Sequence, residues 1–103
     1  MNTNFLRTYH AWHRQARRNL SDQDVDFVFE HGRHIHCAGV LHIFLGKRDI
    51  PCDKETYQRF AHLEGTVLVL SASQGIKQLI TTYRNRQGLK KIRRKTKYEQ
   101  SFT

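Results

Sequence analysis

The sequence predicts an α+β domain in which two N-terminal helices pack on a four-stranded antiparallel sheet, with a basic C-terminal tail. Apolar residues recur every three or four positions in the first third of the chain, as they do in amphipathic helices. Two pairs of short β-prone runs follow, each pair joined by turn residues. Helices gathered on one side of antiparallel strands make a two-layer α+β domain. We therefore expect one domain over residues 1–85 and a basic arm over residues 86–103.

The first predicted helix covers residues 4–20. Its apolar residues are spaced by three or four positions and predict a single buried face made of Phe5, Tyr9, Trp12, Ala16 and Leu20. The same segment holds four arginines and two histidines and no acidic residue. On this helix His13 falls at the edge of the apolar face, one turn before Arg17.

The second predicted helix begins after Ser21, a favourable N-cap, and Asp24 completes a capping box. Its buried stripe is expected to contain Val25, Val28 and Phe29, and Gly32 to end it. Helix chemistry accounts for the acidic residues of this segment, whereas the basic residues before it have no such explanation.

Four strands in two hairpins are expected after the helices. "RHIHCAGVLHIFLG" predicts a hairpin around residues 38–39, and the runs 65–71 and 75–83 predict a second one. Between the hairpins Pro51 breaks the structure and residues 53–63 are expected to form a short helix. The predicted core combines apolar residues of the two helices with apolar residues of the strands. They are Trp12, Val25, Val28, Phe29, Phe44, Val67, Val69 and Ile80.

The charge of the chain indicates an anionic partner. The formal net charge is +9 and the pI is about 10.1, which favours nucleic acid first. The N-terminal stretch "MNTNFLRTYHAWHRQ" contains no continuous apolar run, so we expect a cytoplasmic protein that does not bind a membrane. The two cysteines form no C-x-x-C pair and are expected to be reduced.

Two kinds of chemistry remain open on these residues. Metal-ligating types occur at His34, His36, Cys37, His42, Cys52 and His62, but their spacing matches no standard zinc pattern. Imidazoles would converge only if the first hairpin paired His34 with His42. We expect neither metal nor cofactor. Acid–base chemistry on RNA needs a proton carrier and a cation for the phosphate, which His13 and Arg17 could supply. The alternative is a histidine packed beside Trp12.

The order of these motifs resembles a known family. An H-x-x-x-R pattern on the first helix, then "LSDQDVDFVFEHG", two hairpins and "TTYRN" are similar to a family of small bacterial and archaeal domains grouped with the RelE/ParE/BrnT-like toxin superfamily. The resemblance covers residues 10–95. It implies a helix–helix–sheet fold and an RNA-directed activity, because several members of that superfamily are metal-independent ribonucleases. ParE-like members are not ribonucleases, so the resemblance does not by itself imply cleavage.

The residues that match the family pattern are His13, Arg17, Thr81, Tyr83 and Arg84, with Thr82 where an aliphatic residue is more usual. The resulting hypothesis is a toxin-like RNA-binding protein with catalytic His13, Arg17 and Tyr83. The nucleic-acid contacts are predicted at His10, Arg14, Arg18, Thr81, Arg84, Arg86, Lys90, Lys91, Arg93 and Arg94. Two alternatives stay open. One is a non-catalytic module that binds nucleic acid or the ribosome, and the other is a toxin-like protein bound by an acidic antitoxin.

Overall fold

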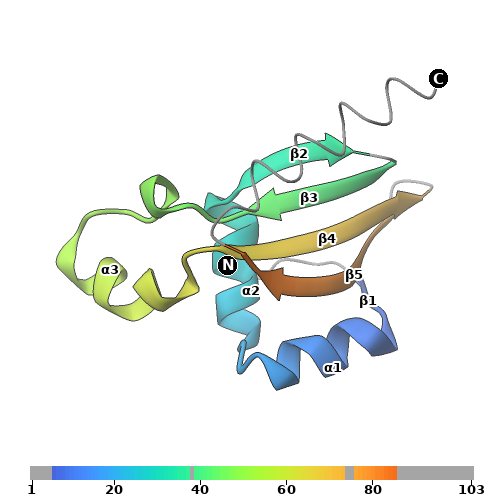
Figure 1. Cartoon of the computed structure of the whole chain (residues 1–103), viewed down its shortest axis with the longest axis horizontal. Helices are drawn as coiled ribbons and strands as arrows, with labels where there is room; N and C mark the ends of the chain where they lie inside the picture. The colour runs from blue at the N-terminus through green and yellow to red at the C-terminus, as the bar shows by residue number, and fades with distance from the viewer. Residues whose placement is uncertain (1–5, 38, 74–75, 86–103) are drawn as a thin grey trace.

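The computed structural model describes residues 6–37, 39–73 and 76–85, and these form a mixed α+β domain built on a five-stranded sheet (Figure 1). The strands are β1 Leu6–Arg7, β2 Arg33–Cys37, β3 Val40–Phe44, β4 Thr66–Ser73 and β5 Ile76–Arg84, in the spatial order β1-β5-β4-β3-β2. The helices are α1 Tyr9–Arg17, α2 Asp22–His31 and α3 Lys54–Phe60, with short 3-10 turns η1 Lys47–Asp49 and η2 Ala61–Leu63. No helix within this described part is long and apolar enough to cross a membrane.

The prediction of four antiparallel strands is wrong in one respect, because β1 adds a fifth strand in parallel to β5. Leu6 lies opposite Gln78 and Arg7 opposite Leu79. Thr8 then closes the strand and starts the helix. Its amide donates to the carbonyl of Leu79 at 3.0 Å, and its hydroxyl donates to that of Ile80 at 3.1 Å and accepts from the amide of Ala11 at 3.1 Å. The predicted helix over residues 4–20 is therefore shorter, because its first residues extend along β5.

The second helix forms as its end signals predict. The Ser21 hydroxyl accepts from the amide of Asp24 at 3.1 Å, and the Asp24 carboxylate accepts from the amide of Ser21 at 3.0 Å. Gly32 ends the helix in extended backbone, with φ −72°. Its lack of a side chain matters for space, because a Cβ there would lie 2.6 Å from the Val28 carbonyl oxygen and 2.7 Å from Cγ2 of Ile43. Glycine thus lets α2 pass close to β3.

Both hairpins form, and β2 to β5 make the expected antiparallel meander. In the first hairpin Cys37 lies opposite Val40, and Gly39 turns the chain with φ +75°. The register places His34 opposite Ile43 and Ile35 opposite His42. This differs by one residue from the pairing that would gather the imidazoles, so His34 and His42 point to opposite faces of the sheet.

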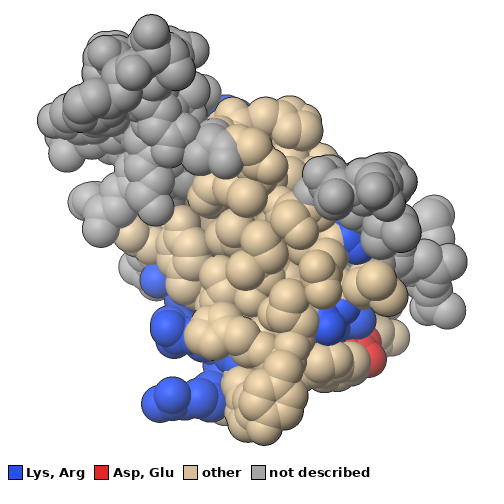
Figure 2. Space-filling model, turned by 90° about the vertical axis from the view of Figure 1, so that its right-hand side faces the viewer, with Lys and Arg blue, Asp and Glu red and all other residues tan. Residues whose placement is uncertain are grey.

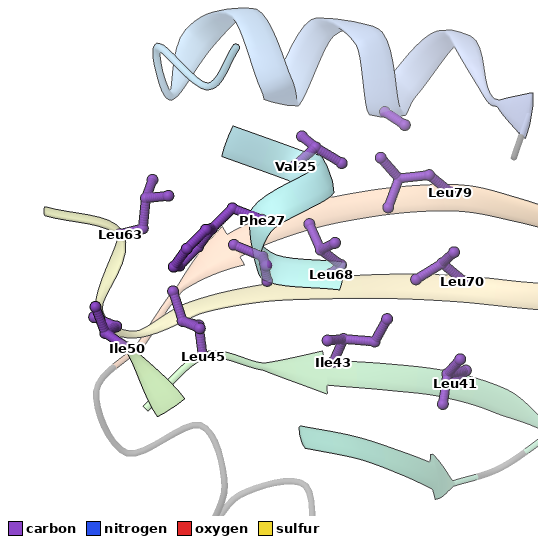
Figure 3. Packing of buried hydrophobic residues seen from close by; sticks show 12 residues of the cluster. Val25, Phe27, Leu41, Ile43, Leu45, Ile50, Leu63, Leu68, Leu70 and Leu79 are labelled. Carbon is purple, nitrogen blue, oxygen red and sulfur yellow. The ribbon is translucent and has the colours of Figure 1, made fainter. Parts of the chain in front are cut away.

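The main core lies between the sheet and the helices (Figure 3). Leu41, Ile43 and Leu45, Leu68 and Leu70, and Leu79 point from three neighbouring strands toward Val25 and Phe27 of α2. α3 joins this core through a stacked pair of rings, Phe27 and Phe60, with centroids 4.0 Å apart. Alternate strand residues make a second cluster on the opposite face, composed of Cys37, Phe44 and Val67 with Ile35, Val69 and Tyr83.

Most of the predicted core residues are in these clusters. Val25, Val28, Phe44 and Val67 are buried, and Phe29, Val69 and Ile80 are half-buried. Ile80 is in neither cluster, and Trp12 is 51% exposed, so the assignment of Trp12 to the core was wrong.

Candidate nucleic-acid interface

The outward side of α1 carries the aromatic residues that were predicted to be buried. Ala11 is fully buried against the sheet and Gln15 is buried beside it, whereas Tyr9 is 80% and Trp12 51% exposed. Ala16 is exposed as well. The helix is therefore turned away from the orientation that its apolar spacing predicts, and its largest apolar side chains face outward.

A polar network holds α1 in this orientation. Arg7 Nε of β1 donates to Gln15 Oε1 at 3.0 Å, and Gln15 Nε2 donates to Asp22 Oδ1 of α2 at 2.8 Å. The Arg7 guanidinium also lies 3.5 Å from Asp22, with its own side chain only 12% exposed. Because buried polar groups need partners, these bonds require Gln15 to face inward. With Gln15 facing inward, Tyr9 and Trp12 of the same helix face outward.

We use the term outer face of α1 for the exposed residues of this helix, Tyr9, His10, Trp12, His13, Ala16 and Arg17. The rings of Tyr9 and His13 meet edge to face with centroids 4.4 Å apart. The Arg7 guanidinium carbon lies 5.0 Å from the centre of the Trp12 ring. The two exposed aromatic rings of α1 thus each contact a basic side chain, His13 for Tyr9 and the mostly buried Arg7 for Trp12.

No acidic residue lies on α1 to neutralise this surface. Arg14 and Arg17 stand in its last turn, and Arg18 caps it. Figure 2 shows one side of the molecule with α1 toward the bottom; Lys and Arg side chains gather at the lower left without Asp or Glu among them. The last turn of α1 and its cap therefore gather arginines at the end of the helix nearest α2.

The structure places the predicted nucleic-acid contacts in two regions. His10, His13, Arg17 and Arg18 are exposed on α1 or its cap, and Arg14 is half-buried. Thr81, Tyr83 and Arg84 lie together at the end of β5. The remaining predicted contacts, Arg86, Lys90, Lys91, Arg93 and Arg94, and the predicted arm as a whole lie outside the described residues.

The predicted grouping of His13 and Arg17 with Tyr83 is not formed. Tyr83 packs in the second cluster with Val67 and Phe44, on the face of the sheet opposite the helices. Burial raises the pKa of the Tyr83 phenol above its ordinary value.

A pocket of about 140 Å³ instead joins Tyr83 and Arg84 to the end of α1. Its lining comes from the α1 cap, η2 and the ends of β4 and β5, and consists of Arg18, Leu20, His62, Leu63, Thr66, Thr82, Tyr83 and Arg84. Sequence reasoning predicted Arg18 and Arg84 as nucleic-acid contacts and Tyr83 as catalytic. It named His62 only as a possible metal ligand, and it noted Thr82 only as a departure from the toxin-like pattern that the sequence resembles.

The possible metal ligands are dispersed. Nowhere in the described ranges do three His, Cys, Asp or Glu side chains gather as a metal site would require. His34 Nε2 lies 2.9 Å from the Phe29 carbonyl oxygen, to which it donates, while His36 is exposed and His42 is buried.

Comparisons with protein-family models, with curated proteins and with solved structures found no match for this chain. The resemblance to the toxin superfamily therefore stays a prediction.

Proposed function

We propose that this protein binds RNA, or another single-stranded nucleic acid, through the outer face of α1. The observation that carries the proposal is the exposure of Tyr9 and Trp12 on the helix that also bears the arginines. Binding is proposed without cleavage, since His13 and Tyr83 lie in different surroundings: the His13 ring meets that of Tyr9 edge to face, and Tyr83 packs on the other side of the sheet.

The charge of α1 supports contact with phosphates. Arginine offers a planar set of donors that matches a phosphate group, and the exposed guanidinium of Arg17 has no acidic neighbour on its helix. The chain as a whole carries +9, which favours association with a polyanion at low salt.

The aromatic residues favour a single strand over a duplex. Bases of a single strand are free to stack on aromatic side chains, and each such contact contributes about 1–3 kcal/mol as measured by alanine substitution. Trp12 and Tyr9 stand one turn of helix apart with much of each ring open. Arginines beside them would contact the backbone that links the stacked bases.

Trp12 is the only tryptophan in the chain, so its fluorescence reports directly on this contact. We expect titration with a single-stranded RNA oligonucleotide to quench it, and anisotropy of labelled RNA to give the same Kd. Trp12→Ala should weaken binding about 5- to 150-fold, the range equivalent to about 1–3 kcal/mol. The matched control is Tyr57→Ala, which removes another exposed aromatic from α3, away from α1. Equal affinity of the two variants would refute the proposal.

The salt dependence tests the ionic part. If about four to six phosphates of a single strand are neutralised, log K falls with log salt with a slope of about −3 to −4. Arg17→Gln should reduce that slope by about 0.7, whereas Lys54→Gln on α3 should leave it unchanged. A slope near zero would show that the positive charge serves no nucleic-acid contact.

Two outcomes would replace the proposal with an alternative. Cleavage of the labelled RNA that disappears on His13→Ala would identify a ribonuclease. Saturable binding of an acidic protein to the outer face of α1, with no affinity for RNA, would identify the toxin-like interaction protein.

A further inference from the structure

We propose that the pocket between the end of α1 and the end of β5 binds a phosphate monoester, of the kind found at the end of a nucleic-acid strand. Phosphate binding in this pocket does not depend on the proposed function. The further claim that the phosphate is the end of a nucleic-acid strand rests on the proposed function. The inference rests on the basic residues that line the pocket and on one buried hydroxyl that has no hydrogen-bond partner in the described part of the chain.

The pocket gathers basic side chains from three separate segments. Arg18 comes from the cap of α1, His62 from η2 and Arg84 from the last position of β5. No Asp or Glu is among the residues that line it. Guanidinium groups that approach from two directions suit a dianionic tetrahedral group, which can accept several hydrogen bonds at once.

The segments that bring Arg18 and Arg84 to the pocket are held by backbone bonds. α1 ends with Asn19 in a left-handed conformation, φ 54°, and the amide of Leu20 donates to the Gln15 carbonyl at 3.0 Å. Arg84 Nε donates to the carbonyl of Glu64 at 3.1 Å, so one edge of its guanidinium is anchored.

Thr82 supplies the second observation. Its side chain is fully buried, the residue is one of those that line the pocket, and its hydroxyl has no hydrogen-bond partner among the described residues. An unpaired buried hydroxyl costs about 1–3 kcal/mol, so native proteins retain few of them. Its neighbours along the helix-facing side of the sheet are leucines, Leu68 opposite it and Leu79 before it. A hydroxyl in such a row is explained if it donates to a ligand in the pocket.

The pocket also adjoins the arginines of α1. A strand that lies along the outer face with its bases on Trp12 would reach Arg18 where the helix ends. A terminal phosphate carries more negative charge than a phosphodiester inside the strand, and the three basic groups would favour it. We therefore expect the protein to prefer strands that end in a phosphate.

The test uses the whole chain and the Thr82→Val variant, which keeps the shape of the side chain and removes the hydroxyl. Inorganic phosphate is titrated at constant ionic strength, followed by amide chemical shifts of residues 82 and 84. RNA oligonucleotides with a 5′-phosphate, a 3′-phosphate or hydroxyl ends are then compared by anisotropy. We expect a terminal phosphate to raise the affinity about tenfold and Thr82→Val to remove most of that gain. The matched control, Thr81→Val, alters the neighbouring threonine, which does not line the pocket.

The outcomes of these experiments distinguish failure of the phosphate pocket from failure of the proposed RNA binding. Phosphate-induced shifts at residues 82 and 84 without any RNA binding would support the pocket and refute the RNA proposal. Equal binding of a nucleoside monophosphate and of a phosphorylated strand would support the pocket with a free nucleotide as the source. Equal binding of phosphorylated and unphosphorylated strands, with no shifts from inorganic phosphate, would overturn the inference. So would a loss of stability in Thr82→Val in phosphate-free buffer, because it would mean that the hydroxyl has an internal partner.

Discussion

Replacing Gly32 with alanine should destabilise the protein through a steric clash between α2 and β3. The backbone of Gly32 is extended, with φ −72°, which alanine adopts without strain. The new Cβ would lie 2.6 Å from the Val28 carbonyl oxygen, 2.7 Å from Ile43 Cγ2 and 3.1 Å from the Phe44 carbonyl oxygen. Two of these are backbone atoms, and Ile43 is fully buried, so none of the three atoms can move freely.

Overpacking of this kind costs about 1–3 kcal/mol of the free energy of unfolding. Urea denaturation followed by far-UV circular dichroism measures it, and the midpoint should fall with an unchanged slope. Gly39→Ala is the informative comparison, because it has φ +75° and no atom within 4 Å of the new Cβ. Its cost is conformational, about 1–2 kcal/mol, and asparagine at position 39 should recover part of it. A Gly32→Ala protein within about 0.5 kcal/mol of wild type would refute the reasoning, since ordinary surface substitutions fall in that range.

The other two predictions concern a helix cap and a titration. Ser21→Ala should lower the free energy of unfolding by about 1 kcal/mol, because it removes the acceptor for the Asp24 amide. Ser21→Asp should retain most of the wild-type stability, because aspartate also accepts at an N-cap. Equal urea midpoints for wild type and Ser21→Ala would contradict this prediction. The raised pKa of Tyr83 predicts a stabilising contribution that is present below pH 10, the ordinary tyrosine pKa, and lost as the pH rises through the folded-state value. Spectrophotometric titration should show one of the four tyrosines ionising late, and Tyr83→Phe should abolish that late step and weaken the alkaline loss of stability. An unchanged titration curve in Tyr83→Phe would show that the phenol is not the late group.

Local signals in the sequence predicted α2, the two hairpins and the short helix between them. Each of these elements is defined by neighbours in the chain. Ser21 and Asp24 form the capping box of α2, Asp53 caps α3 by accepting from the Thr56 amide, and Gly39 turns the first hairpin. Hydrogen bonds between residues three apart can be inferred without knowledge of the rest of the fold.

The parallel strand β1 could not be inferred in the same way. Its partner β5 lies about seventy residues later, with Leu6 opposite Gln78, and two residues carry no alternation to recognise. Thr8 was the one local signal, because it is an N-cap residue directly before Tyr9. A first helix predicted to begin after Thr8 would have been closer to the observed α1, but it would not have revealed that β1 pairs with β5.

The charged residues of the candidate site were predictable from the sequence, but the faces on which they lie were not. Charge on α1 and at the end of β5 was visible in the sequence, and the structure exposes Arg17, Arg18 and Arg84. The face of β5 on which each residue lies depends on the sheet register, which places Thr82 toward the helices and Tyr83 away from them. A bulge between Val69 and Leu70 shifts that register within the strand pair, so alternation counted from one end fails at the other.

The orientation of α1 links the fold to the proposed function. Apolar spacing places Tyr9, Trp12 and Ala16 on one side of the helix, and burial of that side would maximise the apolar area removed from water. The sheet nevertheless takes Ala11, because β1 brings the start of α1 close to β5 and leaves room only for a small side chain there. Gln15 then bonds Arg7 and Asp22, and rotating α1 about its axis to bury Trp12 would break both of these bonds. The exposed rings are thus outside the core for reasons internal to the fold, and they stand where the arginines of α1 can share a ligand with them.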